Sequence, residues 1–166
     1  MEITIGKMSP QDRDEVVAIF RECEQCGDLV LDSDDPGRRD IMRARNLVAR
    51  AQGRVLGWAS VDQAGSGSQT GPAVVSVLVR PGFRRMGIGR ALLNAAIDMA
   101  GQNGIGTLTA GIVPKNVPAL FLHKSCGFRA VGMLPKAGLA GGQWQNVVLL
   151  ERDCLRQAPG APRAQA

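Results

Sequence analysis

The sequence is poor in the residues that bind metals or stack on nucleic-acid bases. It has no tyrosine, a single histidine, His123, and only 4% aromatic residues. Cys23-x-x-Cys26 has no second ligand pair at zinc spacing, so we expect both cysteines to be structural and predict no metal site. Because the basic residues have almost no aromatic interleaving, a nucleic-acid partner is disfavoured.

Long apolar segments are also missing. No apolar run is long enough to span a bilayer, and the N-terminus MEITIGKM lacks the basic and apolar regions of a signal peptide. We therefore expect a cytoplasmic protein without a membrane partner. Residues 1–155 suit one domain, and residues 156–166, rich in proline and alanine, suggest a disordered tail.

Acidic residues are nearly absent from the middle of the chain. Residues 63–150 contain one acid, Asp98, against eight bases, whereas residues 1–62 contain twelve acids and nine bases. A basic, solvated face is one explanation of this asymmetry. A polyanionic ligand is the other, and it is the one that the motifs below favour.

The most informative stretch runs from Val74 to Gly89. Residues 73–79 are apolar and β-branched apart from Ser76, a pattern that predicts a strand covered on both faces. Pro81 and Gly82 end it, and Gly87 and Gly89 then open a helix whose free N–H groups favour anions. Four arginines surround the turn: Arg80, Arg84, Arg85 and Arg90. The residues alone predict a phosphate or pyrophosphate site.

This turn is neither of the two common nucleotide motifs. A G-x-G-x-x-G fingerprint would need glycine at Leu92, and no Gly-Lys-Ser/Thr follows. Arg84, Gly87 and Gly89 instead match the acetyl-CoA signature Gln/Arg-x-x-Gly-x-Gly/Ala. Asn116 to His123 and Cys126 to Phe128 match a second family motif, Asn-x-x-Ala/Ser-x-x-Leu/Phe-Tyr/His-x-x-x-Gly-Phe. Residues 132–134 and 141–147 match a third stretch, which is typical of one branch of that family. From about Arg54 to Asp153 the chain therefore resembles the GNAT superfamily of N-acetyltransferases, and within it the phosphinothricin acetyltransferase branch.

The remaining elements follow from periodicity and turn residues. We predict strands at residues 2–8, 47–51, 54–61, 107–113, 128–134 and 146–152, and helices from Ser9 to near Gly27, from about Asp35 to Arg45, from Ile88 to about Gly101 and over 116–125. This order predicts a mixed α/β sheet with helices on both faces. It is also the order of the GNAT-type acyl-CoA N-acyltransferase fold.

The resemblance implies transfer of an acetyl group from acetyl-CoA to an amine by direct attack in a ternary complex. In the family the central strand separates from its neighbour, and its backbone binds the pantetheine arm. That role would fall to Val77, Leu78 and Val79. The pyrophosphate would lie on the backbone of the turn, and Asn116 would lie beside the pantetheine. The turn residues concerned are Arg84, Arg85, Met86, Gly87, Ile88, Gly89 and Arg90.

The catalytic residues are harder to assign. His123 stands where many members have a tyrosine that protonates the departing thiolate, which makes it a catalytic candidate as well as a structural one. The branch has a glutamate at a place that falls at about Val74 here, with Ser76 the only polar neighbour and second candidate. The branch's arginine in the loop before the central strand is also missing. The sequence therefore disfavours phosphinothricin as the acceptor substrate.

Two hypotheses remain beside a much weaker nucleic-acid one. The first is an N-acetyltransferase acting on a small, amino-acid-like amine, and the second is a CoA-binding module with little or no catalysis, suggested by Val74. The sequence leaves the acceptor, the general base and the oligomeric state open. A homodimer is an expectation by analogy with the branch.

Overall fold

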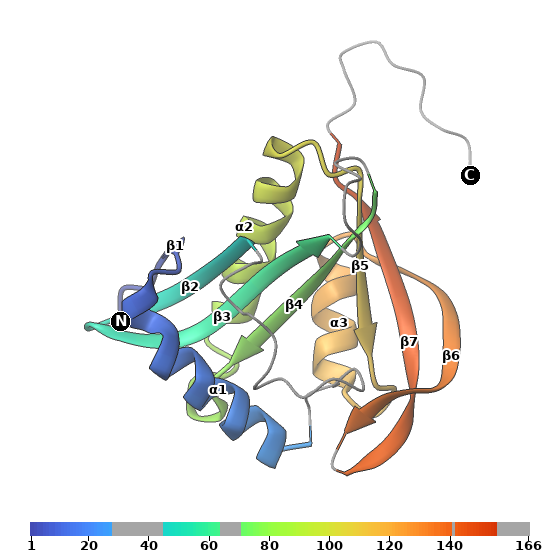
Figure 1. The fold of residues 1–166 in the computed structure, drawn as a ribbon, viewed down its shortest axis with the longest axis horizontal. Helices are drawn as coiled ribbons and strands as arrows, with labels where there is room; N and C mark the ends of the chain where they lie inside the picture. Colours follow the sequence, from blue (N-terminus) through green and yellow to red (C-terminus); the bar gives the residue numbers. More distant parts are fainter. Residues whose placement is uncertain (28–44, 64–70, 141, 156–166) are drawn as a thin grey trace.

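A computed structural model describes residues 1–27, 45–63, 71–140 and 142–155. In this part of the chain, one seven-stranded sheet has the order β1-β2-β3-β4-β5-β7-β6 (Figure 1). The strands are β1 (Thr4–Lys7), β2 (Arg45–Ala51), β3 (Arg54–Gln63), β4 (Ala73–Val79), β5 (Thr107–Ile112), β6 (Arg129–Ala140) and β7 (Gln143–Asp153). All neighbours are antiparallel except β4 and β5. The predicted mixed sheet is confirmed.

The first helix begins where the sequence predicts a start. Pro10–Asp12 forms one 3₁₀ turn that leads into α1 (Arg13–Gln25). The backbone N–H and hydroxyl of Ser9 both donate to Asp12 Oδ2, at 2.7 and 3.0 Å, so the acid three residues on holds the chain entering the helix. Arg50 of β2 forms an ion pair with the same carboxylate and ties this start to the sheet.

Helices cover both faces of the sheet (Figure 1). On one face, Val16, Ile19 and Cys23 of α1 pack with residues of β2, β3 and β4, among them Trp58 and Leu78. On the other face, α2 (Ile88–Gln102) packs into the larger core, and α3 (Val117–Ser125) lies against it. Alternate residues of β3 and β4 enter the two cores, as expected for a strand between two helical layers.

β4 and β5 are joined at one end only. Their pairing consists of Ala73 with Leu108 and Val74 with Thr109. Beyond Val74 the two strands diverge, which Figure 1 shows as a widening space toward the C-terminal end of β4. β3 stays paired with β4 as far as Val79, so only the β5 side of β4 is left open. The separation implied by the resemblance is confirmed.

Several boundaries differ from the prediction. The sequence places both faces of β4 under cover, and this is wrong at Val74, which is 40% exposed. The strand predicted to end at Leu134 continues to Ala140, because pairing with β7 resumes at Gly138 after an irregularity at Pro135 and Lys136. Arg45 belongs to β2 rather than to a helix. The rest of the helix predicted before it and the predicted tail, residues 156–166, lie outside the described residues.

Candidate functional site

The N-terminus of α2 presents unbonded amides. Gly87 is the N-cap, and the first helical hydrogen bond runs from Ala91 N to Gly87 O, at 3.0 Å. The amides of Ile88, Gly89 and Arg90 therefore have no acceptor within the helix. Together with the helix dipole they favour an anion in front of this end.

Two glycines shape this end for different reasons. Gly87 has a φ of +84°, the left-handed region in which most side chains are strained. At Gly89, a Cβ atom would lie 3.2 Å from Leu122 Cδ2 of α3 and 3.7 Å from Val79 Cγ2 of β4. Gly87 thus allows the turn, and Gly89 allows α2 to approach its neighbours closely.

The turn before α2 is open to solvent. Arg85, Met86, Gly87 and Arg90 are exposed, Met86 by 51%. Arg85 adopts a φ of +65°, so the turn contains two residues in the left-handed region, Arg85 and Gly87. Arg85 and Arg90 therefore add two exposed cationic side chains next to the free amides in sequence, and Arg90 Nη1 lies 4.0 Å from Cys126 Sγ.

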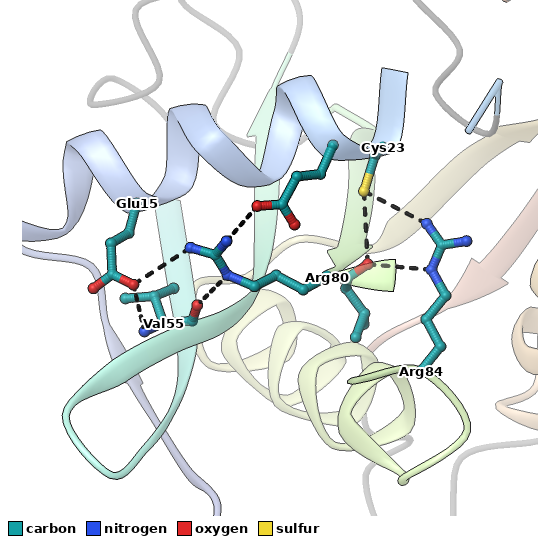
Figure 2. A network of polar contacts seen from close by, with 7 residues as sticks. Glu15, Cys23, Val55, Arg80 and Arg84 are labelled. Atoms are coloured by element: carbon teal, nitrogen blue, oxygen red, sulfur yellow. Dashed lines mark hydrogen bonds and ion pairs between the residues drawn. The ribbon is translucent and has the colours of Figure 1, made fainter. Parts of the chain in front are cut away.

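Arg80 has a different role from the one its position in the sequence suggests. Its side chain is buried between β3 and α1, where it forms ion pairs with Glu22 and, at 3.4 Å, with Glu15. Its Nε donates to the carbonyl of Val55 at 2.8 Å (Figure 2). The prediction that Arg80 surrounds the anion-binding turn is wrong, because this guanidinium holds α1 on the sheet.

Arg84 turns back toward the end of β4. Its Nε donates to the carbonyl of Val79 at 3.2 Å, and Nη2 lies 3.6 Å from the sulfur of Cys23 (Figure 2). Cys23 also contacts the Val79 carbonyl, at 3.6 Å. Cys23, Cys26 and the two other cysteines of the chain form no disulfide. Cys23 is thus a buried core residue near the end of α1, consistent with the structural role expected for it.

The backbone of β4 has a free side where β5 turns away. Arg80 N donates to Leu56 O of β3, and backbone groups of alternate residues point to the same side of a strand. Leu78 therefore faces β3, whereas Val77 and Val79 face the open side. Because Arg84 and Cys23 occupy the Val79 carbonyl, the groups left for a ligand are both polar groups of Val77 and the N–H of Val79.

Asn116 caps α3, the helix beside this open side. Its Oδ1 accepts a hydrogen bond from Ala119 N at 3.2 Å. An N-cap function is one of the two roles that the sequence allows for this residue. The side-chain NH₂ group has no partner among the hydrogen bonds of the described residues, so it remains able to donate to a ligand.

His123 is buried in α3. Its Nδ1 lies 2.8 Å from the carbonyl of Ala119, so Nδ1 carries the proton, and its ring meets Phe128 edge to face at 5.2 Å. Burial lowers the pKa of His123 and outweighs the opposing effect of this hydrogen bond. The ring is therefore neutral near pH 7, and Nε2 is an acceptor in that state.

Val74 and Ser76 occupy the face of β4 that α1 covers further along. Ser76 is half-buried, and it pairs across to the buried Ser60 of β3. No carboxylate stands on β4 itself.

A cavity of about 400 Å³ lies just after β5, beside the later part of β6 and the first residues of β7. It is lined by Pro114, Lys115, Lys136, Trp144, Gln145 and Asn146. The lining includes two ammonium groups and no carboxylate, which suits an anionic group. Both lysines are among the eight basic residues of 63–150, but nothing in the sequence indicates that they line the same cavity.

The comparisons with known proteins agree with this geometry. Residues 13–128 match the model of the acetyltransferase (GNAT) family. An L-methionine sulfoximine/L-methionine sulfone acetyltransferase of Salmonella typhimurium is 33% identical over 114 residues, 68% of this chain and 67% of that protein. A phosphinothricin N-acetyltransferase of Streptomyces viridochromogenes is 31% identical over 117 residues, 70% of this chain and 64% of that protein.

Solved structures share the whole fold. The protein yncA of Salmonella typhimurium, solved with its cofactor acetyl-CoA, superposes with a TM-score of 0.80 at 25% identity, covering 99% of this chain and 100% of that one. The chain belongs to the GNAT acetyltransferase family. It is an N-acetyltransferase that uses acetyl-CoA as its cosubstrate, as the motifs predict.

The residues present fit this cosubstrate. Free amides and exposed arginines at α2 suit a pyrophosphate, and the open side of β4 offers a strand edge to an extended amide-containing arm. In the described ranges, no three His, Cys, Asp or Glu side chains come together as a metal site would need. No helix of these ranges is long and apolar enough to cross a membrane.

Proposed function

We propose that this enzyme acetylates the amine of a small, amino-acid-like acceptor by direct attack within a ternary complex. The observation that carries the proposal is the separation of β4 from β5 beyond Val74, directly beside the exposed N-terminus of α2. This geometry gives the cosubstrate a binding place that leaves the α1 face of the sheet for a second substrate.

The cosubstrate contacts that we propose use the backbone groups that have no partner at the start of α2 and along the open side of β4. The amides of Ile88, Gly89 and Arg90 take the pyrophosphate, with Gly87 keeping the approach open. The side chains of Arg85 and Arg90 neutralise its charge, while Met86 lines the approach.

The arm would be held by the second group of residues. Val77 and Val79 pair with it through backbone groups, and the Asn116 amide donates to it from α3. Leu78 supports this edge from the α1 core, and Arg84 fixes the carbonyl of Val79. These roles fix the thioester in place, which brings a large part of the rate enhancement in a two-substrate reaction.

The catalytic candidates Ser76 and His123 stay predictions. Ser76 lies on the strand that flanks the proposed acyl group. His123 is buried and neutral near pH 7, so it has no proton on Nε2 to give to a thiolate in that state. Bulk water reaching the open side of β4 is a sufficient proton source for a thiolate leaving group.

The relatives support an amino-acid-like acceptor. Those named above act on L-methionine sulfoximine, L-methionine sulfone and phosphinothricin, each an amino acid with a tetrahedral sulfur or phosphorus group. The cationic cavity at Lys115 and Lys136 would suit an anionic group of such a molecule. The missing arginine and glutamate of the branch argue for a different member of this substrate class.

Release of the CoA thiol, measured with a panel of amines, tests the proposal. The panel contains these three compounds, the common L-amino acids and simple alkylamines. We expect turnover of one or more amino acids and intersecting lines in double-reciprocal plots, the pattern of a ternary complex. Parallel lines would contradict direct attack, and no turnover with any amine would contradict the proposed acceptor class.

A further inference from the structure

One row of side chains crosses the sheet at the level where β4 and β5 part. Asp62 of β3 pairs with Val74 of β4, and Val74 pairs with Thr109 of β5. Thr109 pairs in turn with Glu151 of β7, which pairs with Arg129 of β6. Directly paired residues project from the same face of a sheet, so these five side chains share one face.

This face is the one that α1 partly covers. Leu78 lies four residues after Val74 on the same strand, and its side chain packs with Val16 and Ile19 of α1. At Val74 the cover has ended, because that side chain is 40% exposed. A molecule approaching this face therefore reaches the row at the point where the proposed acyl group would lie.

The two carboxylates of the row differ in their partners. Glu151 Oε1 accepts a hydrogen bond from Arg129 Nη2 at 3.0 Å, so its charge is compensated. Asp62 is exposed, and its carboxylate makes no hydrogen bond or ion pair within the described part of the chain. The nearest carboxylates of α1 on this face, Glu15 and Glu22, are paired with Arg80. Among the described carboxylates of this row and of its α1 cover named here, Asp62 is thus the one without a cationic partner.

Asp62 is also close enough to act. Asp62 and Val74 form a hydrogen-bonded antiparallel pair, since the pair Leu56 and Arg80 is bonded and the pattern alternates. Their Cα atoms are therefore about 5.5 Å apart. Only one strand, β4, separates the Asp62 carboxylate from the opening between β4 and β5.

We propose that Asp62 is the carboxylate that binds the ammonium group of the acceptor and takes up the proton that this group must lose. This proposal rests on the proposed function above. Alkylamines are mostly protonated at pH 7, as the lysine pKa of about 10.4 illustrates, and a protonated nitrogen has no lone pair for attack.

The step balances as follows. Asp62 accepts one proton from the acceptor, and the freed lone pair forms the N–C bond to the thioester carbonyl carbon. The C–S bond breaks, the sulfur leaves as a thiolate and is protonated, and the amide nitrogen loses its second proton. One proton is released overall, and Asp62 can return its own to water because it is exposed.

The test compares Asp62→Asn with Asp98→Asn, an exposed aspartate of α2 that serves as the control. Each is assayed at pH 7 with the preferred acceptor of the panel above and with the α-aminooxy analogue of that acceptor, whose nitrogen is neutral at this pH. We expect Asp62→Asn to lower kcat/KM about 100-fold for the amine, a usual size for lost acid–base catalysis, and only a few-fold for the analogue. The acetyl-CoA affinity of Asp62→Asn should equal that of wild type, and Asp98→Asn should keep wild-type kcat/KM for both acceptors.

A second variant tests the position of the carboxylate. Val74→Glu in the Asp62→Asn background places an acid on the neighbouring strand of the same row, and we expect it to recover a large part of the lost activity. Equal rates of wild type and Asp62→Asn, equal losses with both acceptors, or no recovery would overturn the role of Asp62 while leaving the proposed function intact. A wild type inactive on every amine would instead refute the proposed function, and the role of Asp62 with it.

Discussion

Val74 and Thr109 form the last residue pair between β4 and β5, and beyond it the two strands share no pairing. A parallel pair that ends after two residues leaves backbone donors and acceptors without sheet partners. The free groups of Val77 and Val79 lie on this side, next to the free amides at the start of α2. The same part of the chain therefore offers an edge for an extended arm and an anion site.

The first prediction concerns the turn before α2. Gly87→Asp should weaken CoA binding by about tenfold or more, a loss of at least about 1.4 kcal/mol, because its carboxylate would stand among the phosphates. Gly104→Asp is the matched control, since Gly104 also has a positive φ, +72°, and open space around its Cα, but lies after α2. Isothermal titration measures both affinities. Equal affinities of the two variants would contradict the anion site.

The second prediction separates two arginines. Arg80→Met should lower the free energy of unfolding by about 1 to 2 kcal/mol, because it leaves Val55 O and two carboxylates of α1 without their partner. The effect stays modest since Glu15 and Glu22 are each 38% exposed. Arg85→Met should leave stability unchanged and weaken CoA binding. Urea denaturation and titration of both variants check this, and the reverse pattern would refute it.

The third prediction follows from the buried imidazole. The pKa of His123 is lowered in the folded state, so the neutral ring contributes stability that is fully present above its unfolded pKa of about 6.5. This contribution is lost as the pH falls through the folded-state pKa. Wild type should therefore lose more stability than His123→Gln between pH 8 and pH 5. Parallel pH profiles of the two proteins would show that burial does not hold the ring neutral.

The same variant addresses catalysis. If His123 only packs, His123→Gln should keep most of its acetyl-transfer rate once the measurement is made well below its melting temperature. A large loss of kcat in a fully folded variant would support the catalytic role predicted from the sequence.

The fourth prediction concerns the start of α1. Burial raises the pKa of Asp12, but hydrogen bonds from Ser9 and the contact with Arg50 outweigh it and hold the pKa below its usual value. Its stabilising effect is present above the unfolded pKa of about 3.9 and is lost as the pH falls through the lower folded-state value. Asp12→Asn should thus be less stable than wild type at pH 7, with the gap closing toward pH 2. A constant gap across this range would contradict the assignment.

The turn and helix start to which we assign the cosubstrate were predictable from the sequence because their signals are local. Gly87 and Gly89 are set by the turn and by helix packing, and Arg85 and Arg90 are their neighbours in sequence. The strand before them and the helix after them follow from apolar periodicity. The contacts that we propose are made by backbone amides, so a few adjacent residues of the motif are enough to specify them.

The remaining relationships join distant parts of the chain. Arg80 meets Glu15 and Glu22, which are two helical turns apart on α1, and nothing in the sequence indicates which arginine they face. Asp62 stands beside Val74 only through the register of β3 and β4. A missing acid at Val74 could be read from the motif, but its neighbour across the strand could not.

Amide hydrogen exchange followed by NMR, with and without acetyl-CoA, is the most direct test of the proposed cosubstrate site. The amides of Ile88, Gly89 and Arg90 lack helical acceptors, and those of Val77 and Val79 lack a strand partner, so all five should exchange quickly in the free enzyme. We predict that acetyl-CoA slows exchange at these five positions above all others. Protection confined to the cavity of Lys115 and Trp144, with these five amides unchanged, would contradict the assignment.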